Sequence, residues 1–233
     1  MTAILEARGL RKAYQGGDGG SIEVLADLDL IVNRGEFVAI MGSSGAGKST
    51  LLHLLGALDT PTAGTVLLEG VSYTERDTAE LARMRNHKLG FVFQFHHLLR
   101  EFSALENVMM PLLIGQADED AARSRAEELL AAVGLADRMS HRPNQLSGGE
   151  QQRVAVARAL VTDPVVVLAD EPSGNLDRHN SERLHDLFTR LTREFETAVV
   201  AVTHNGALAA RADRILNLDE GRLVPHGVES MPT

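Results

Sequence analysis

The stretch FVAIMGSSGAGKSTLLHLL, residues 37–55, decides the fold of this chain. Five apolar residues lead into a loop with three glycines, and leucines at helical spacing follow, so the stretch predicts a buried strand, a tight loop and a helix. The loop, Gly42 to Thr50, matches the phosphate-binding pattern G-x-x-x-x-G-K-[ST]. A helix that begins at such a loop points the positive end of its dipole at a bound anion. The stretch therefore predicts a nucleotide-binding α/β fold.

Each residue type in this loop has a physical role in holding phosphate. Glycines allow the backbone to turn so that several N–H groups face one anion, and the Lys48 ammonium adds a charge for the outer phosphates. The hydroxyl of Ser49 is a ligand for Mg²⁺. The residues expected to bind the nucleotide here are Gly42, Ser43, Ser44, Gly45, Ala46, Gly47, Lys48, Ser49 and Thr50.

Two later apolar runs, Val165 to Asp170 and Ala198 to Thr203, have the length of strands buried on both faces. Between them, residues 178–195 carry leucines and phenylalanines at three- and four-residue steps, which predicts the crossover helix of a right-handed βαβ unit. Earlier, residues 21–32 alternate in polarity, as half-buried strands do. We expect a parallel sheet flanked by helices.

Residues 95–158 differ from this series of strands because they are rich in helical patterns. We therefore expect one domain over residues 1–233, with a nucleotide-binding core from 1–94 and 159–233 and a helical subdomain from 95–158.

The composition excludes several classes of function. With 23 Lys and Arg against 32 Asp and Glu, the net charge is −9, which disfavours nucleic acid and anionic lipid as partners. The chain has no Cys, which excludes disulfides and thiol catalysis. No uninterrupted apolar run reaches the roughly 18 residues of a membrane span. We expect a soluble cytoplasmic chain without a direct lipid anchor.

Two neighbouring acids, Asp170 and Glu171, follow an apolar run at the expected ligand-binding edge of the sheet. An Asp at this position holds Mg²⁺ through its water shell, and Glu171 could accept a proton from the water that attacks the γ-phosphate. An isolated pair of this kind is usually a solvent-facing strand end. Beside a phosphate loop, we favour the hydrolytic interpretation.

The segment LSGGEQQRVAVARAL, residues 146–160, adds a second glycine-rich helix N-terminus at Ser147, Gly148 and Gly149. Alone, such a segment is usually a turn and a helix cap. Here it resembles the signature motif of ATP-binding-cassette (ABC) ATPases, whose other motifs occur in the family's order. The further matching positions are Tyr14, Gln94, Asp177 and His204.

The resemblance implies a P-loop α/β fold with a mainly parallel sheet core, an N-terminal antiparallel β region and a helical subdomain. It implies ATP and Mg²⁺ as cofactors, with Glu171, His204 and Gln94 as catalytic residues and Ser49, Gln94 and Asp170 as metal ligands. Tyr14 would stack on the adenine, and His204 would contact the γ-phosphate. Two copies would pair head to tail, so that the signature residues of one copy help to bind the ATP held by the other. Asp177 is a further residue that the resemblance assigns to nucleotide binding.

Below the superfamily, residues 51–66, 85–115 and 141–153 resemble the ATPase subunit of lipoprotein-releasing systems, and the likeness extends from about 4 to 224. That resemblance implies two integral membrane subunits as partners and a peripheral position at the cytoplasmic face of a bacterial inner membrane. The alternative is a related complex of the macrolide-export or cell-division type. The positions that depart from the common pattern are Ala46, Arg100, Gln151 and Asn205, of which only Asn205 lies near the chemistry.

An apolar cluster after Gln94 exceeds what a small subdomain needs to bury, so we expect part of it to form a docking surface for the membrane subunits. Its members are Phe95, Leu98, Leu99, Phe102, Leu105, Val108 and Met109. The adjacent His96 and His97 do not predict a metal site, because neighbouring side chains diverge and no acidic partner follows at ligand spacing.

Overall fold

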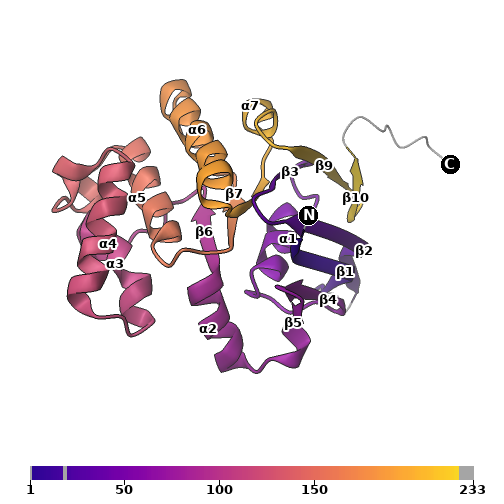
Figure 1. Ribbon diagram of the computed structural model, residues 1–233. Helices are drawn as coiled ribbons and strands as arrows, with labels where there is room; N and C mark the ends of the chain where they lie inside the picture. Colours follow the sequence, from indigo (N-terminus) through magenta and orange to yellow (C-terminus); the bar gives the residue numbers. More distant parts are fainter. Residues whose placement is uncertain (1, 18–19, 226–233) are drawn as a thin grey trace.

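The computed structural model describes residues 2–17 and 20–225, so both ends of the predicted 1–233 domain lie outside the described residues. The described residues form two sheets, one antiparallel and one mainly parallel, together with the helices that cover them. Figure 1 shows the antiparallel sheet at one end of the molecule and helices α3, α4 and α5 at the other. The predicted α/β class is confirmed.

The mainly parallel sheet has the strand order β10-β9-β3-β8-β7-β6. All of its neighbouring strands run parallel except β9 and β10. In register, Val202 lies opposite both Ile40 and Asp170, so β3, β7 and β8 end at one edge. The strands are β3 (Phe37–Met41), β6 (Leu89–Phe93), β7 (Val166–Asp170), β8 (Ala198–Val202), β9 (Arg214–Asp219) and β10 (Arg222–Pro225).

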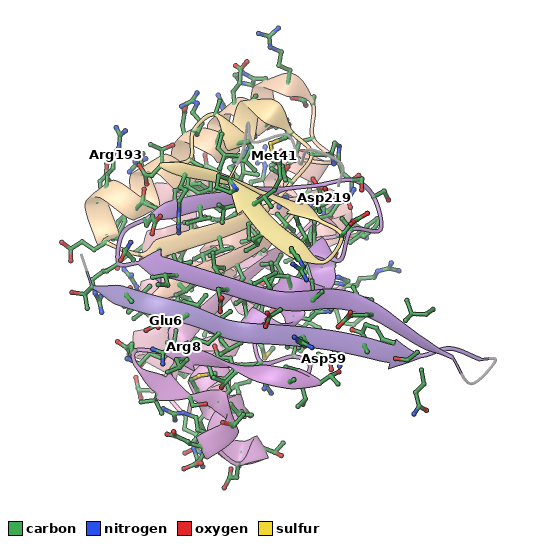
Figure 2. All side chains as sticks on the ribbon, turned by 90° about the vertical axis from the view of Figure 1, so that its right-hand side faces the viewer. Glu6, Arg8, Met41, Asp59, Arg193 and Asp219 are labelled. Carbon is green, nitrogen blue, oxygen red and sulfur yellow. The ribbon has the colours of Figure 1, made fainter. Side chains whose placement is uncertain are left out.

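The antiparallel sheet has the order β2-β1-β4-β5 and contains the alternating segment that the sequence indicated. Its long strands β1 and β2 run side by side across the face shown in Figure 2. The register between them shifts at several points, and such bulges bend a strand and increase its twist. The strands are β1 (Ala3–Gln15), β2 (Ser21–Asn33), β4 (Ala63–Leu68) and β5 (Val71–Ser72).

The helices begin where the sequence places capping residues. Asp77, Ser103 and Ser147 each form a capping box with a Glu three residues later, which satisfies backbone donors at the helix start. The helices are α1 (Lys48–Leu55), α2 (Thr78–Lys88), α3 (Ala104–Ile114), α4 (Glu119–Ala132), α5 (Gly148–Leu160), α6 (Arg178–Phe195) and α7 (Gly206–Ala209). Short 3₁₀ turns lie at Tyr73–Glu75, Ala136–Arg138 and Pro143–Gln145. Within the described part of the chain, no helix has the length and apolar character needed to cross a membrane.

One hydrophobic cluster contains buried residues from both the parallel sheet and the helical segment. This cluster contains Phe37 and Val167 of the parallel sheet together with Val108 of α3 and Leu130 of α4. Helix α5 approaches β6 so closely that a Cβ on Gly90 would lie 2.4 Å from the carbonyl oxygen of Ala159. The helical segment and the sheet are therefore packed into one continuous core.

The fold divides the apolar cluster after Gln94 into buried, partly buried and exposed members. Val108 and Met109 are buried in the core because they lie on the inward face of α3. Leu98 and Leu105 are partly buried against the same core. The exposed members are Phe95, Leu99 and Phe102.

Candidate nucleotide site

A cavity of about 750 Å³ lies where the strands β3 and β7 end. The residues lining it come from the glycine loop, from the ends of β6 and β7, and from the segment after β8. The structure thus brings most of the predicted residues together. Its lining residues are Val24, Gly42, Ser44, Gly45, Gly47, Lys48, Ser49, Thr50, Gln94, Asp170, Glu171 and His204.

The glycine loop leaves the N-terminus of α1 open toward this cavity. Gly47 has φ +98°, and a Cβ there would lie 2.8 Å from Cγ1 of Val24, so both backbone conformation and space require glycine. No side chain caps the first N–H groups of α1, which are therefore free to bind an anion. The Lys48 ammonium donates hydrogen bonds to the carbonyl oxygens of Gly42 and Ser43, at 2.8 and 2.9 Å.

Two predicted loop residues contribute through the backbone or the core and do not line the cavity. Ser43 accepts hydrogen bonds at its carbonyl oxygen from Lys48 and from the N–H of Ala46. The Ala46 side chain packs against the core beneath the antiparallel sheet. Both residues therefore shape the loop.

Asp170 ends β7 and faces the hydroxyl of Ser49, which donates a hydrogen bond to its carboxylate. Burial raises the pKa of the Asp170 carboxyl above its ordinary value; the Ser49 hydrogen bond acts against this rise, and the neighbouring Glu171 charge adds to it. The two carboxylates, the hydroxyl of Ser49 and the amide of Gln94 line one cavity. This oxygen donor set fits Mg²⁺, which takes one or two carboxylates alongside phosphate oxygens.

The Glu171 carboxylate is held by the segment that follows β8. The Thr203 hydroxyl donates a hydrogen bond to Oε2 at 3.0 Å, and the backbone N–H of His204 donates to Oε1 at 3.1 Å. The ring atom Nδ1 of His204 lies 2.8 Å from Oε1. The Glu171 side chain is only 14% exposed, whereas that of His204 is 72% exposed. The histidine ring therefore covers the acid from the solvent side.

Glu171 also has an unusual backbone conformation. Its φ is +43°, which side chains other than glycine rarely adopt, and its N–H donates to the carbonyl oxygen of Val202 at 2.9 Å. The turn directly after β7 thus aims the carboxylate toward the end of β8. Sequence reasoning missed Thr203, although its place directly after an apolar run beside His204 was the available signal.

Gln94 follows β6 and exchanges hydrogen bonds with Asn175, whose Oδ1 accepts from its Nε2 at 3.3 Å. Two side chains of α5 hold the backbone on either side of it. The buried Gln152 donates to the carbonyl oxygens of Phe93 and Pro172, at 3.4 and 2.7 Å. Sequence reasoning missed both residues, although Gln152 lies inside the quoted segment 146–160 and Asn175 lies two residues before Asp177.

Arg158 holds the other side of Gln94. Its guanidinium donates to the carbonyl oxygens of His96 and His97, each at 2.8 Å. His97 adopts φ +48°, so the chain turns sharply where Arg158 binds it. The segment after β6 is thereby bonded to α5 at both ends.

The structure does not bring the other predicted binding residues into this cavity. Ser147 caps α5 and exchanges hydrogen bonds with Glu150, with Gly148 and Gly149 in the first turn. Asp177 caps α6 and accepts hydrogen bonds from the N–H and side chain of Asn180. Tyr14 bonds to Asp59 on the antiparallel sheet side. Among the described residues, none of these lines the cavity.

Asn205, the departure nearest the chemistry, is a helix cap. Its Oδ1 accepts hydrogen bonds from the N–H groups of Ala207 and Leu208 at the start of α7. Its side-chain nitrogen lies 3.4 Å from the hydroxyl oxygen of Ser173. Asn and Asp are comparable as helix caps, so Asn205 preserves the start of α7. The ring of His204 is oriented by its contact with Glu171.

Known proteins share these features. The sequence profile of the family described as ABC transporter matches residues 25–174, from the strand beside the cavity to the turn after Glu171. The chain belongs to the ABC transporter family. This ABC protein is 57% identical to the lipoprotein-releasing system ATP-binding protein LolD of Bordetella pertussis over 221 residues, 95% of each chain. It is 51% identical to LolD of Geobacter metallireducens, over 96% of this chain and 99% of that protein.

Two solved structures of the ABC cassette MJ0796 match this ABC chain over 94% of its length and 96% of theirs, each with a TM-score of 0.87. One, at 40% identity, is a dimer in a post-hydrolysis state bound to ADP and Pi, and the other, at 41% identity, is also dimeric. Together with the family match, they establish this chain as an ATP hydrolase that uses ATP and Mg²⁺.

Proposed function

We propose that this chain is the ATP-hydrolysing subunit of an ABC complex that releases outer-membrane-directed lipoproteins from the inner membrane. The observation that carries the proposal is the identity of 51–57% to LolD proteins over about 95% of the chain, which includes every motif of the nucleotide site. On this proposal the chain is peripheral at the cytoplasmic face, and it reaches the membrane through protein partners.

In this proposal Glu171 is the general base. Thr203 and His204 hold its carboxylate at the wall of the cavity, where it accepts a proton from the water that attacks the γ-phosphate. When ATP binds, the Lys48 ammonium replaces its hydrogen bonds to the carbonyl oxygens of Gly42 and Ser43 by hydrogen bonds to phosphate oxygens, because it lies at the cavity wall. Ser49, Gln94 and Asp170 would hold Mg²⁺, which would supply positive charge to neutralise the phosphates.

We further propose that a second copy completes the site. Ser147 and Gly148 are exposed at the N-terminus of α5, Gly149 beside them is buried, and all three lie apart from the cavity of their own chain. Such a terminus binds anions, so it suits the phosphates held by a partner copy. Asp177, at the exposed start of α6, would lie in the same contact. ATP binding would then draw two copies together and hydrolysis would release them.

The membrane subunits would dock beside the Gln94 segment. A cavity of about 360 Å³ there is lined by Leu58, Phe91, Phe93 and Ile114 among others. Phe95 is 68% exposed and Ile114 is 65% exposed, and a contiguous patch of exposed apolar side chains marks a site of protein contact. The division into a core of 1–94 and 159–233 and a helical subdomain of 95–158 belongs to this proposal, since the docking surface lies at their junction.

Purification of the chain with its native membrane partners tests the assignment. We expect two integral membrane subunits, and the complex in liposomes should release an acylated lipoprotein to a soluble acceptor when ATP is added. Partners of a macrolide-export or cell-division complex would refute it. Phe95→Asp with Ile114→Asp should abolish co-purification, whereas Phe195→Asp, at a similarly exposed phenylalanine on α6, should not.

A further inference from the structure

A buried lysine on β1 has no role in the site described above. Lys12 is 9% exposed, and its ammonium donates hydrogen bonds to Oδ1 of Asp59 at 2.7 Å and to the carbonyl oxygen of Thr60 at 2.8 Å. The other oxygen of Asp59 accepts a hydrogen bond from the Tyr14 hydroxyl at 2.9 Å. Asp59 lies beside the C-terminal part of β1 in Figure 2.

Two side chains contact Tyr14, with Asp59 at its hydroxyl and Lys12 over its ring. The Lys12 ammonium lies 4.8 Å from the centroid of the Tyr14 ring, within the range of a cation–π interaction. Burial acts to raise the pKa of Asp59, but the hydrogen bonds from Lys12 and Tyr14 outweigh it and hold this pKa below its ordinary value. Asp59 is therefore ionised at neutral pH, and it fixes the hydroxyl end of a ring whose one face is covered by Lys12.

Tyr14 remains 41% exposed although the Lys12 ammonium lies over one face of its ring. An aromatic ring held in this way at a protein surface suits a planar, apolar ligand group. Tyr14 lies opposite Ile22 in the register of β1 and β2. Val24, which lines the nucleotide cavity, is two residues further along β2, or about 7 Å at the rise of a strand.

Asp59 also connects the ring to the phosphate loop. It lies in the turn that follows α1, four residues after Leu55, and its N–H donates to the carbonyl oxygen of His53 in that helix at 3.3 Å. The opposite end of the same helix begins at Lys48. One rigid helix therefore sets the distance between the phosphate loop and the group that orients Tyr14.

We propose that Lys12 and Asp59 are positioning residues that hold the Tyr14 ring with one face open to the base of the nucleotide. The inference rests on the proposed nucleotide site and adds to it the residues that set affinity for the base. A preorganised ring loses less rotamer freedom when the base binds, and ordering one side chain costs enough to weaken binding by about three- to tenfold. A merely structural pair would instead tie β1 to the turn after α1 without any effect on the base.

The test compares two probes of the full-length chain, MgATP and Mg-tripolyphosphate, by isothermal titration calorimetry. Lys12→Met combined with Asp59→Asn removes the ion pair without leaving a buried unpaired charge. We expect this double variant and Tyr14→Ala to weaken ATP binding by about three- to tenfold and to leave tripolyphosphate binding unchanged. The control is Glu6→Gln, which breaks the exposed pair with Arg8 on the same strand (Figure 2) and should change neither affinity.

The outcomes separate this inference from the proposed function. If Tyr14→Ala lowers the ratio of ATP to tripolyphosphate affinity and the double variant does not, Lys12 and Asp59 do not position the ring. If Tyr14→Ala leaves the ratio unchanged, the ring does not bind the base and the inference is wrong, while the phosphate site stands. Weak binding of both probes by the wild-type chain would instead contradict the nucleotide site itself.

A spectroscopic measurement reports on the ring directly. The chain has two tyrosines and no tryptophan, so a Tyr73→Phe background leaves Tyr14 as its fluorophore. In that background the double variant should lower the fluorescence anisotropy of Tyr14, because the ring gains freedom. Equal anisotropy with and without the double variant would overturn the proposal even if both proteins fold and melt alike.

Discussion

Replacing Thr203 by valine tests whether the segment after β8 positions the proposed base. Thr203 is fully buried, its hydroxyl donates to Oε2 of Glu171 at 3.0 Å, and it accepts from the N–H of Asn205 at 3.0 Å. Valine keeps the branched shape and removes both hydrogen bonds. Among the described residues, the carboxylate then retains its contacts to His204, whose side chain is mostly exposed.

The magnitude follows from these contacts. A hydrogen bond to a charged group contributes about 1.5–3 kcal/mol, and the bond that Asn205 loses is partly replaced by water because this residue is half-buried. We therefore expect Thr203→Val to lower the free energy of unfolding by about 2 kcal/mol. If about 1.4 kcal/mol of that loss is expressed as misplacement of Glu171 in the transition state, kcat falls about tenfold. KM for ATP should change little, because Thr203 does not line the cavity.

Two variants make the experiment interpretable. Thr203→Ser keeps the hydroxyl and should restore most of kcat. Thr197→Val removes a buried hydroxyl at the opposite end of β8, where it donates to the carbonyl oxygen of Pro164 at 3.2 Å, so it should cost about 1 kcal/mol of stability without affecting kcat. Urea unfolding and steady-state ATP hydrolysis of the assembled complex measure both quantities. A kcat for Thr203→Val within twofold of wild type, or an equal fall in Thr197→Val, would refute the reasoning.

Three further predictions follow from the same cavity. Glu171→Gln should retain ATP binding, abolish turnover and trap a dimer in size-exclusion chromatography; near-normal hydrolysis would falsify the assignment of the base. Lys48→Ala should lose nucleotide affinity in calorimetry, and unchanged binding would remove this ammonium from the phosphate site. Burial raises the pKa of Asp170 in the folded chain, so the folded state keeps this proton to a higher pH than the unfolded state does. The folded chain therefore loses stability as the pH rises from the unfolded to the folded pKa of Asp170. Asp170→Asn should therefore raise the melting temperature of the nucleotide-free, metal-free chain at pH 7.5 and have little effect at pH 4, whereas an equal shift at both pH values would contradict this.

Much of the fold could be predicted because local patterns determine it. The strands β3, β7 and β8 are continuous apolar runs, and burial on both faces in a parallel sheet requires such runs. The helix predicted at residues 178–195 has those bounds in the structure, since its cap Asp177 and its apolar spacing lie in adjacent residues. The phosphate loop could be predicted for the same reason, because its pattern lies in the contiguous residues 42–50. The cavity brings its residues together with Asp170 and Gln94 because the parallel strands end at one edge.

The remaining features depend on contacts between residues far apart in the chain. The bond from Tyr14 to Asp59 joins a strand to a turn 45 residues later, and no spacing rule indicates it. The apolar cluster after Gln94 could not be divided into core and surface from composition. Val108 is buried because it lies on the inward face of α3, whereas Phe95 lies before this helix and is exposed. Excess apolar content indicated an exposed surface but could not identify its members.

The same long-range contacts decide how the parts of the site can move. Gln94 itself is bonded only through Asn175 among the contacts described, but the backbone before and after it is fixed by Gln152 and Arg158 of α5. Because Gln152 also binds the carbonyl oxygen of Pro172, next to Glu171, helix α5 contacts both the Gln94 segment and the turn that carries the proposed base. The N-terminus of α5 carries Ser147 and the two glycines. If a partner copy contacts that terminus, as proposed above, the contact would act on the Gln94 segment and on the Glu171 turn through the same helix, because Gln152 and Arg158 of α5 bind both.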